Sequence, residues 1–390
     1  MSYFPPTIAQ TSDFPIGIEV SHAEGIYLYD STGKKYIDLI SGIGVNNLGH
    51  RHPAIISAIN QQLEKYLHTM VFGEFLQEPQ IKLAKRLSEL LPENLGCTFF
   101  VNSGSEAVEG AIKLAKRFTG RTEIIAFNKS YHGSTHGALS VMGNEEFKQN
   151  YRPLLPDVKF IEFNEEVALE TISDSTACVI IEPIQGEGGV KVADKKYLKR
   201  LREICNKFRV LLIFDEVQCG MGRTGTLWAF EQFGVTPDIL LLAKAFGGGL
   251  PLGAFISSQE IMSVLKNNPI LGHITTFGGN PLSCVAGYAI LETLNSSDIL
   301  SVIPKKEKLF RKLLSHKNIL EIRGKGLMLA VELGNADKAF SVIQKSMNAG
   351  LITDWFLHCP TALRISPPLT ISEPEIELAC SIINKVLDEC

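Results

Sequence analysis

The chain has 390 residues, of which 45% are hydrophobic and 21% are charged, a composition typical of a folded protein of about two domains. Its 38 basic and 42 acidic residues nearly balance, so no nucleic-acid partner is expected and a small-molecule partner is favoured. The longest apolar runs, such as residues 239–243, are far shorter than the ~18 residues of a membrane-spanning helix, so no membrane partner is expected.

The cysteines predict an intracellular protein. All eight are scattered, without a C-x-x-C pair, and no signal peptide is recognised in the first ten residues, "MSYFPPTIAQ". Scattered cysteines without a secretion signal are typical of reduced thiols, so a cytoplasmic location is expected.

The first half of the chain predicts a hairpin followed by helices and strands. Residues 25–39 predict a hairpin with its turn at residues 31–33. Residues 80–91 have apolar side chains at helical spacing, and residues 97–104 predict a strand that runs into a turn. Residues 106–120 predict a helix that ends at its final glycine.

Short apolar segments in the middle of the chain predict buried strands. They are residues 123–127, 177–183, 210–216 and 238–244, with helical stretches between several of them. Strands that are apolar on both faces and alternate with helices indicate an α/β fold with a largely parallel sheet covered by helices on each side.

The last part of the chain predicts a smaller α+β domain. Residues 303–316 predict a helix, residues 320–333 are strand-like, and a final helix is expected from Glu373. The expected division is an N-terminal segment at 1–44, a large domain at 45–295 and a C-terminal small domain at 296–390.

Ligands of open α/β sheets bind beyond the carboxyl ends of the strands, which directs attention to the residues that follow each strand. In "VNSGSEA", Gly104 and Ser105 lead into a helix whose first N–H groups are unpaired and favour an anion such as a phosphate. The alternative is an ordinary helix cap formed by Ser103 or Ser105.

Two charged residues also stand at strand ends. Asp215 closes "VLLIFDE", where a buried carboxylate requires a cation, and Lys244 closes "DILLLAK", where burial would favour a nucleophilic neutral amine. The alternative for both is a structural ion pair between them. An anion site, a carboxylate and a lysine are together what pyridoxal phosphate requires, and Tyr131 could stack on its ring.

The glycines 220, 222 and 225 in "QCGMGRTG" match the G-x-G-x-x-G pattern of nicotinamide-cofactor enzymes. Five residues, 215–219, separate them from the apolar run, and the candidate acid Asp238 precedes its strand instead of ending it. We therefore interpret these glycines as a loop beside the pocket or a subunit interface.

Histidine pairs raise the alternative of a metal site. The candidates are His50 with His52 and His132 with His136, but no third ligand is evident and Gly133 disfavours a helix that would present the second pair together. No metal is therefore expected. His132 is interpreted as a structural neighbour of the cofactor, and Glu182 either joins the network around the ring or only ends a strand.

At these residues the chain resembles the class III (ω-amino acid) aminotransferases of fold type I, the group of the acetylornithine, ornithine and 4-aminobutyrate aminotransferases. The resemblance runs nearly end to end and includes "FVNSGSEAVEGAIKLA", "YHGSTHGALS", "IIEPIQGEGGV", "IFDEVQCGMGRTG", "LLLAKAFGGGLPLGA", "TTFGGNPLSC" and "LRISPPLTI". It implies a large domain with a mainly parallel seven-stranded sheet flanked by helices, and a smaller α+β domain built from both terminal segments.

The resemblance implies a role for each residue of the cofactor site. Lys244 would form the Schiff base and move the substrate proton, and Asp215 would hold the proton of the pyridinium nitrogen. The remaining cofactor contacts would be Tyr131 and Val217 on the two ring faces, Gln218 near the ring hydroxyl, Gly104 and Ser105 at the phosphate, and Thr276 at the phosphate of the neighbouring subunit in a homodimer.

The resemblance also places the substrate residues. Arg364 would bind the α-carboxylate of the keto acid, and Glu187 would pair with that arginine when an ω-amine is bound. Members of the group usually carry arginine, which binds a second carboxylate, where this chain has Ser134. Ile43 would make the same pocket apolar.

The leading hypothesis is therefore a homodimeric, pyridoxal-phosphate-dependent aminotransferase. It would move an amino group, expected to be a terminal one, from an amine or amino acid to 2-oxoglutarate or pyruvate by a ping-pong mechanism. The alternatives are an aminomutase or epimerase with the same cofactor and a catalytically silent binding homologue, and the least favoured is the nicotinamide-dependent oxidoreductase.

Overall fold

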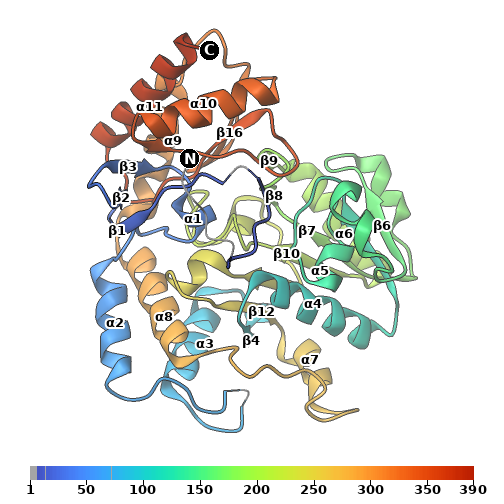
Figure 1. The fold of residues 1–390 in the computed structure, drawn as a ribbon. Coiled ribbons are helices and arrows are strands. Elements are labelled where there is room, and N and C mark those ends of the chain that lie inside the picture. Colours follow the sequence, from blue (N-terminus) through green and yellow to red (C-terminus); the bar gives the residue numbers. More distant parts are fainter. Residues whose placement is uncertain (1–6, 14, 72) are drawn as a thin grey trace.

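A seven-stranded sheet lies at the centre of the larger part of the molecule (Figure 1). The computed structural model describes residues 7–13, 15–71 and 73–390. The first six residues of the expected N-terminal segment therefore lie outside the described residues, and they are also the start of the ten residues in which no signal peptide was expected. In spatial order the strands are β4 (Cys97–Val101), β12 (Gly253–Ser257), β11 (Ile239–Leu242), β10 (Leu211–Asp215), β7 (Thr176–Ile181), β5 (Glu123–Phe127) and β6 (Val158–Ile161).

The sheet is mainly parallel, as predicted. Strands β11, β10, β7, β5 and β6 pair in parallel, whereas β12 runs antiparallel to both of its neighbours, β11 and β4. The predicted strands correspond to β4, β5, β7, β10 and β11. The sequence interpretation did not identify β6 or β12.

Both faces of this sheet are covered, which explains the unbroken apolar runs of its strands. Along β10, Leu211 and Ile213 belong to the apolar cluster formed with α4 (Gly104–Thr119). Leu212 and Phe214 point into the cluster on the opposite side, which includes residues of α6 (Lys195–Phe208). The alternation places successive side chains on opposite faces, and each face is buried.

The helices of the larger part begin and end close to their predicted limits. Helix α3 (Glu78–Leu90) matches the prediction for residues 80–91, and α4 is followed by Gly120 in the left-handed region, with φ of 70°. Helix α8 (Pro281–Ser296) packs with both α3 and α2 (Pro53–Leu63) at one end of the molecule (Figure 1).

The terminal segments of the chain meet in the smaller part. The predicted hairpin is formed by β2 (Tyr27–Asp30) and β3 (Lys35–Asp38), with β1 (Val20–Glu24) beside β2, and β3 pairs in parallel with β15 (Leu351–Ile352). A three-stranded antiparallel sheet contains β13 (Glu321–Lys325), β14 (Met328–Glu332) and β16 (Ala362–Ile365). The N-terminal hairpin is thus joined to the C-terminal part of the chain.

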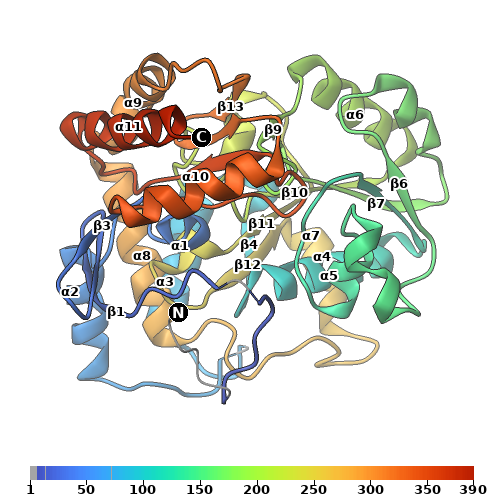
Figure 2. The ribbon, with the colours of Figure 1, turned by 45° about the horizontal axis from the view of Figure 1, so that its top comes forward.

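Three helices accompany these small sheets: α9 (Ile299–Leu313), α10 (Ala336–Asn348) and α11 (Glu373–Asp388) (Figure 2). Helix α11 starts at the predicted Glu373. Helix α9 starts four residues before the predicted 303 and includes Pro304 in its interior. A proline past the first turn removes one hydrogen bond of the helix and crowds the carbonyl of residue 300, and the burial of Ile303 and Phe310 favours the helix in spite of that cost.

The shorter elements connect this framework. They are α1 (Ser41–Gly44), α5 (His136–Ser140), α7 (Gln259–Met262), β8 (Ile184–Gln185) and β9 (Lys191–Val192). None of the helices in the described residues has both the length and the apolar character that crossing a membrane requires.

The contact between α4 and β12 gives a test of the packing. A Cβ atom at Gly110 would lie 2.3 Å from Cε1 of the fully buried Phe255. Because the core cannot absorb this overlap, we expect Gly110→Ala to lower the free energy of unfolding by about 1–3 kcal/mol, measured by urea denaturation. A Gly110→Ala, Phe255→Leu double variant should lose less than the sum of the two single variants, and strictly additive losses would contradict this contact.

Candidate functional site

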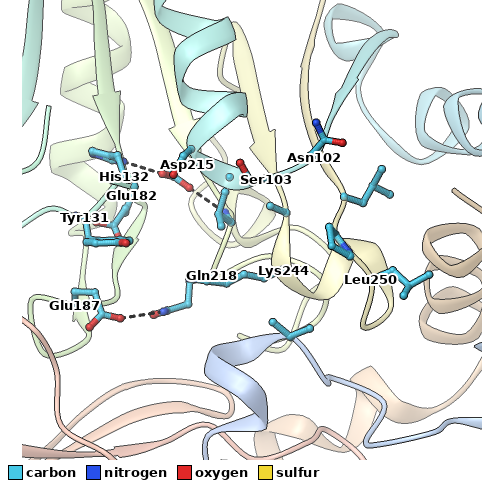
Figure 3. Close-up of a pocket in the computed structure, with 18 of the residues that line it drawn as sticks. Asn102, Ser103, Tyr131, His132, Glu182, Glu187, Asp215, Gln218, Lys244 and Leu250 are labelled. Atoms are coloured by element: carbon cyan, nitrogen blue, oxygen red, sulfur yellow. Dashed lines mark hydrogen bonds and ion pairs between the residues drawn. The ribbon is translucent and has the colours of Figure 1, made fainter. Parts of the chain in front are cut away.

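A cavity of about 410 Å³ opens at the carboxyl ends of the central strands (Figure 3). Residues that follow four different strands line it: Asn102 after β4, Glu182 after β7, Asp215 at the end of β10 and Lys244 after β11. This is the edge at which open α/β sheets bind their ligands.

Asp215 is buried and paired with a histidine. Its Oδ2 lies 2.7 Å from Nδ1 of His132, and its Oδ1 accepts the N–H of Val217 at 3.0 Å. Burial disfavours the charged form of His132, but the hydrogen bond and charge of Asp215 outweigh it and raise the pKa of the imidazole. The alternative of an ion pair between Asp215 and Lys244 is wrong for the structure, because Asp215 is paired with His132 instead.

Glu182 holds the loop that carries His132. Its carboxylate accepts the backbone N–H of Tyr131 at 2.9 Å and that of Gly186 at 2.8 Å. Burial raises the pKa of Glu182 to about 7, while the charge of His132 acts in the opposite direction. Glu182 therefore joins the network around Asp215, the first of its two expected roles.

Lys244 begins the turn after β11 with a left-handed backbone, φ 50°. Burial lowers the pKa of its ammonium, and the charges of Glu187 and Asp215 oppose that shift. Lys244 lines the cavity, and no hydrogen bond from its Nζ is found among the residues that the structure describes. A lysine amine with these surroundings is suited to reversible attack on a carbonyl group.

The start of α4 leaves backbone donors free beside the cavity. The Oγ of Ser103 accepts the N–H of Glu106 at 3.2 Å, so Ser103 is the N-cap of the helix. The sequence had suggested either Ser103 or Ser105 as a cap, and it is Ser103. The N–H groups of Gly104 and Ser105 have no acceptor among the described residues. A Cβ at Gly104 would lie 3.0 Å from Cγ1 of Val217, so a glycine allows the start of the helix to lie close against Val217.

An ion pair lies at another wall of the cavity, where Glu187 is part of the lining and Arg364 is bonded to it from outside the lining. Nη2 of Arg364, on β16, lies 2.9 Å from both carboxylate oxygens of Glu187, which also accepts the N–H of Leu357 at 3.1 Å. Nε2 of Gln218 donates to Glu187 at 3.2 Å (Figure 3). Although burial opposes ionisation of Glu187, the charge of Arg364 and the N–H of Leu357 lower its pKa.

The cavity thus brings together most of the predicted site residues, and others lie outside its lining. Ser134 is exposed at the rim, where its Oγ lies 3.3 Å from the Tyr131 hydroxyl. Thr276 is exposed and does not line the cavity of its own chain. Val45 lines the cavity in place of Ile43, because residues 41–44 form a left-handed turn that displaces the expected side chain. The predicted residues in the lining are Gly104, Ser105, Tyr131, Glu187, Asp215, Val217, Gln218 and Lys244.

The sequence interpretation missed several contributors. Asn102, Val45 and residues 249–252 also line the cavity. Their only sequence signal was their position after a strand or within a glycine-rich loop. The sequence predicted that His132 lies near the cofactor but not that it binds Asp215. The two residues are 83 positions apart, so no short sequence pattern indicates their hydrogen bond.

The glycines of "QCGMGRTG" belong to a loop that packs on the C-terminal part of the chain. A Cβ at Gly222 would meet Leu300 at 2.6 Å, and Nη1 of Arg223 donates to the carbonyls of Leu327 and Pro367. No helix opens at these glycines, which a dinucleotide-binding loop would require. Within residues 7–13, 15–71 and 73–390, no group of three or more His, Cys, Asp or Glu side chains could hold a metal ion.

The residues around the cavity fit pyridoxal phosphate. That cofactor requires a lysine for its aldehyde, a carboxylate for its ring nitrogen and N–H donors for its phosphate. Lys244, Asp215 and the free N–H groups of Gly104 and Ser105 border one space. Oε1 of Gln218 is buried there without a partner among the described residues, so a polar acceptor of the site stays unsatisfied by the protein alone.

Comparison with known proteins agrees with this chemistry. Residues 8–387 match the family of class-III aminotransferases. The acetylornithine aminotransferase of Methanocaldococcus jannaschii is 43% identical over 384 residues, which cover 94% of this chain and 92% of that protein.

Solved structures share the whole fold. The ornithine aminotransferase of Toxoplasma gondii, solved with partial occupancy of pyridoxal phosphate in its active site, has a TM-score of 0.91 at 31% identity and covers 98% of this chain and 92% of its own. An amine transaminase from an uncultivated Pseudomonas species, in its pyridoxal-phosphate-bound form, has a TM-score of 0.91 at 27% identity, covering 100% and 99%. The chain belongs to the class III aminotransferases and is a pyridoxal-phosphate-dependent aminotransferase.

Proposed function

We propose that the enzyme moves a terminal amino group from a primary amine or amino acid to 2-oxoglutarate or pyruvate in two alternating half-reactions. The ion pair between Arg364 and Glu187 carries this proposal, because Glu187 lines the cavity together with Lys244 and engages the guanidinium of Arg364. With the pair closed, the site suits an amine without a neighbouring carboxylate. With Glu187 displaced, Arg364 is free to bind the carboxylate next to the carbonyl of a keto acid.

The residues around Lys244 have separate roles in this proposal. Pyridoxal phosphate supplies an aldehyde that reacts with amines and a ring that withdraws electrons from the reacting carbon. Lys244 is the base that takes the substrate proton and later returns it, which its lowered pKa favours. Asp215, supported by His132, holds a proton on the ring nitrogen, and Gly104 and Ser105 bind the phosphate.

The proposed assembly is a homodimer in which Thr276 reaches the phosphate site of the partner. Large apolar side chains are exposed in two segments, one that includes His68 and Leu76 and one that includes Ile270 and Phe277. Leu76 is 92% exposed, Ile270 72% and Phe277 56%. The two segments are in contact, since the ring centroids of His68 and Phe277 lie 4.8 Å apart. Exposed apolar patches of this kind are typical of subunit interfaces. A cytoplasmic location, favoured by the eight free cysteines, belongs to the same proposal.

Replacing Lys244 tests the central role. We expect Lys244→Ala to lower kcat by about 10²- to 10⁴-fold or more, because the proton-transfer group is lost. Borohydride reduction followed by peptide mass analysis should attach the cofactor to the peptide that contains residue 244 in the wild type, and to no peptide in the variant. Lys195→Ala, an exposed change on α6, is the control. Full activity and covalent labelling in Lys244→Ala would refute the assignment.

Replacing Glu187 tests the switch. We expect Glu187→Ala to lower kcat/KM for terminal amines by roughly tenfold or more, because Arg364 then stays exposed to the cavity without its partner. For α-amino acids such as glutamate or alanine, kcat/KM should be unchanged or higher. Glu187→Gln, which keeps the size but not the charge, should shift the ratio in the same direction. Equal losses for both substrate classes, or turnover without any keto acid, would contradict the proposal.

Mixed dimers test the role of Thr276. Lys244→Ala and Thr276→Asp should each be inactive alone, the second because a carboxylate repels the cofactor phosphate. Co-expressed with two different tags, they should form mixed dimers with restored activity, because one site then has both an intact Lys244 and an intact Thr276 from the partner. Mixed dimers that stay inactive would show that Thr276 does not complete the partner's site, and sedimentation would establish whether dimers form.

A further inference from the structure

Arg364 is held by the segment that precedes β16, residues 353–358. The backbone N–H of Arg364 donates to the carbonyl of Asp354 at 2.7 Å, and its carbonyl accepts the hydroxyl of Thr353 at 2.7 Å. The side chain of Arg364 is buried. The place of this buried guanidinium therefore depends on groups that the segment itself supplies.

Two kinds of contact fix the guanidinium. Its Nη2 donates to both carboxylate oxygens of Glu187 at 2.9 Å and to the carbonyl of Trp355 at 3.2 Å. Its Cζ lies 4.3 Å from the centroid of the Phe356 ring. The negative face of an aromatic ring attracts a cation at this distance, and most strongly where water is excluded. Because Phe356 and Arg364 are both buried, this attraction acts in a dry environment.

Phe356 opens a tight turn that also holds Glu187. The carbonyl of Phe356 accepts the N–H of Cys359 at 3.1 Å, which closes the turn. Between these residues, the N–H of Leu357 donates to Oε2 of Glu187 at 3.1 Å. The N–H of His358 donates to the backbone carbonyl of Glu187 at 3.0 Å. One hydrogen-bonded turn thus contacts both members of the ion pair.

The contacts of Arg364 differ in what happens to them when Glu187 is displaced. The proposed switch removes the carboxylate from Nη2. The Phe356 ring and the Trp355 carbonyl belong to the backbone and packing of the turn, so they stay beside the guanidinium. A buried cation that loses its carboxylate is costly unless other groups stabilise it. The ring face and the carbonyl are in position to do so.

We propose that Phe356 is a positioning residue of the reaction. Its ring keeps the guanidinium of Arg364 oriented while Glu187 is displaced, so the carboxylate of the keto acid meets a cation that is already in place. The inference rests on the proposed function and adds the residue that holds the substrate-binding arginine. Phe356 also belongs to the apolar core, so attraction to the ring has to be separated from packing.

Fluorinated phenylalanines at position 356 separate the two effects. Fluorine withdraws electrons from the ring face and weakens its attraction for a cation, while the ring keeps nearly the same size. With one, two and three ring fluorines, we expect the apparent dissociation constant of the keto acid to rise stepwise, to roughly tenfold. It is measured in single turnovers of the pyridoxamine-phosphate enzyme with pyruvate or 2-oxoglutarate. The maximal rate should stay near the wild-type value.

The half-reaction of a terminal amine is the internal comparison. In the proposed function this half-reaction keeps Glu187 on Arg364, so its dissociation constant should change little along the same series. These constants do not depend on the amount of active enzyme, so a partial loss of folded protein does not alter them. The cofactor absorbance reports the amount of folded holoenzyme.

Two further variants control for packing. The same fluorinated series at Phe310, an equally buried ring of α9 among apolar side chains, should leave the keto-acid constant unchanged. Phe356→Leu, which keeps an apolar side chain without a ring face, should raise that constant at least as much as three fluorines do.

The outcomes separate this inference from the proposed function. A flat response along the series at Phe356, an equal response at Phe310, or equal changes for terminal amines and keto acids would overturn the role of the ring. Each of these results leaves the aminotransferase function intact. A wild-type enzyme that transfers no amino group, or a Glu187→Ala variant with an unchanged preference between the two donor classes, would instead contradict the proposed function.

Discussion

The carboxylate of Asp215, buried at the end of a central strand, is the constraint on which the site depends. A buried carboxylate is stable only with a cation or several N–H donors. His132 supplies the first and the N–H of Val217 the second. The loop that carries His132 is in turn held by Glu182, which accepts the N–H of Tyr131. One charge thus fixes the positions of several loops at the same edge of the sheet.

The cofactor side and the substrate side of the cavity have different structural origins. Asp215 and Lys244 follow strands of the large sheet, whose two faces are packed against helices. Arg364 comes from β16 of the smaller part, and Ser134 from an exposed loop. In the proposed function, a rigid framework therefore positions the shared chemistry, while loops and a separate sheet supply the substrate contacts. This division allows related enzymes to keep one reaction and differ in their substrates.

Short stretches of sequence predicted those strands and site residues whose environment depends on their immediate neighbours in the chain. Strands β5, β7, β10 and β11 are apolar on both faces, and Asp215 and Lys244 stood out because charges rarely follow such runs. Strand β12 was missed because it starts directly after a run of glycines and a proline, and β6 because it has four residues and is half exposed. The His132–Asp215 bond and the contacts of Glu187 depend on the folded chain, and the expected reach of Thr276 depends on a second copy of it.

The left-handed turn at residues 41–44 limits how the substrate wall can vary. Ser41, Gly42, Ile43 and Gly44 all have positive φ values, between 50° and 73°. Each non-glycine residue in this conformation costs about 1–2 kcal/mol, and the N–H of Ser41, held by the carboxylate of Asp38, helps to offset that cost. Substitutions within the turn therefore carry a conformational penalty that Val45, just beyond it, escapes. Within residues 41–45, natural drift or directed evolution can therefore change the cavity lining most readily at Val45.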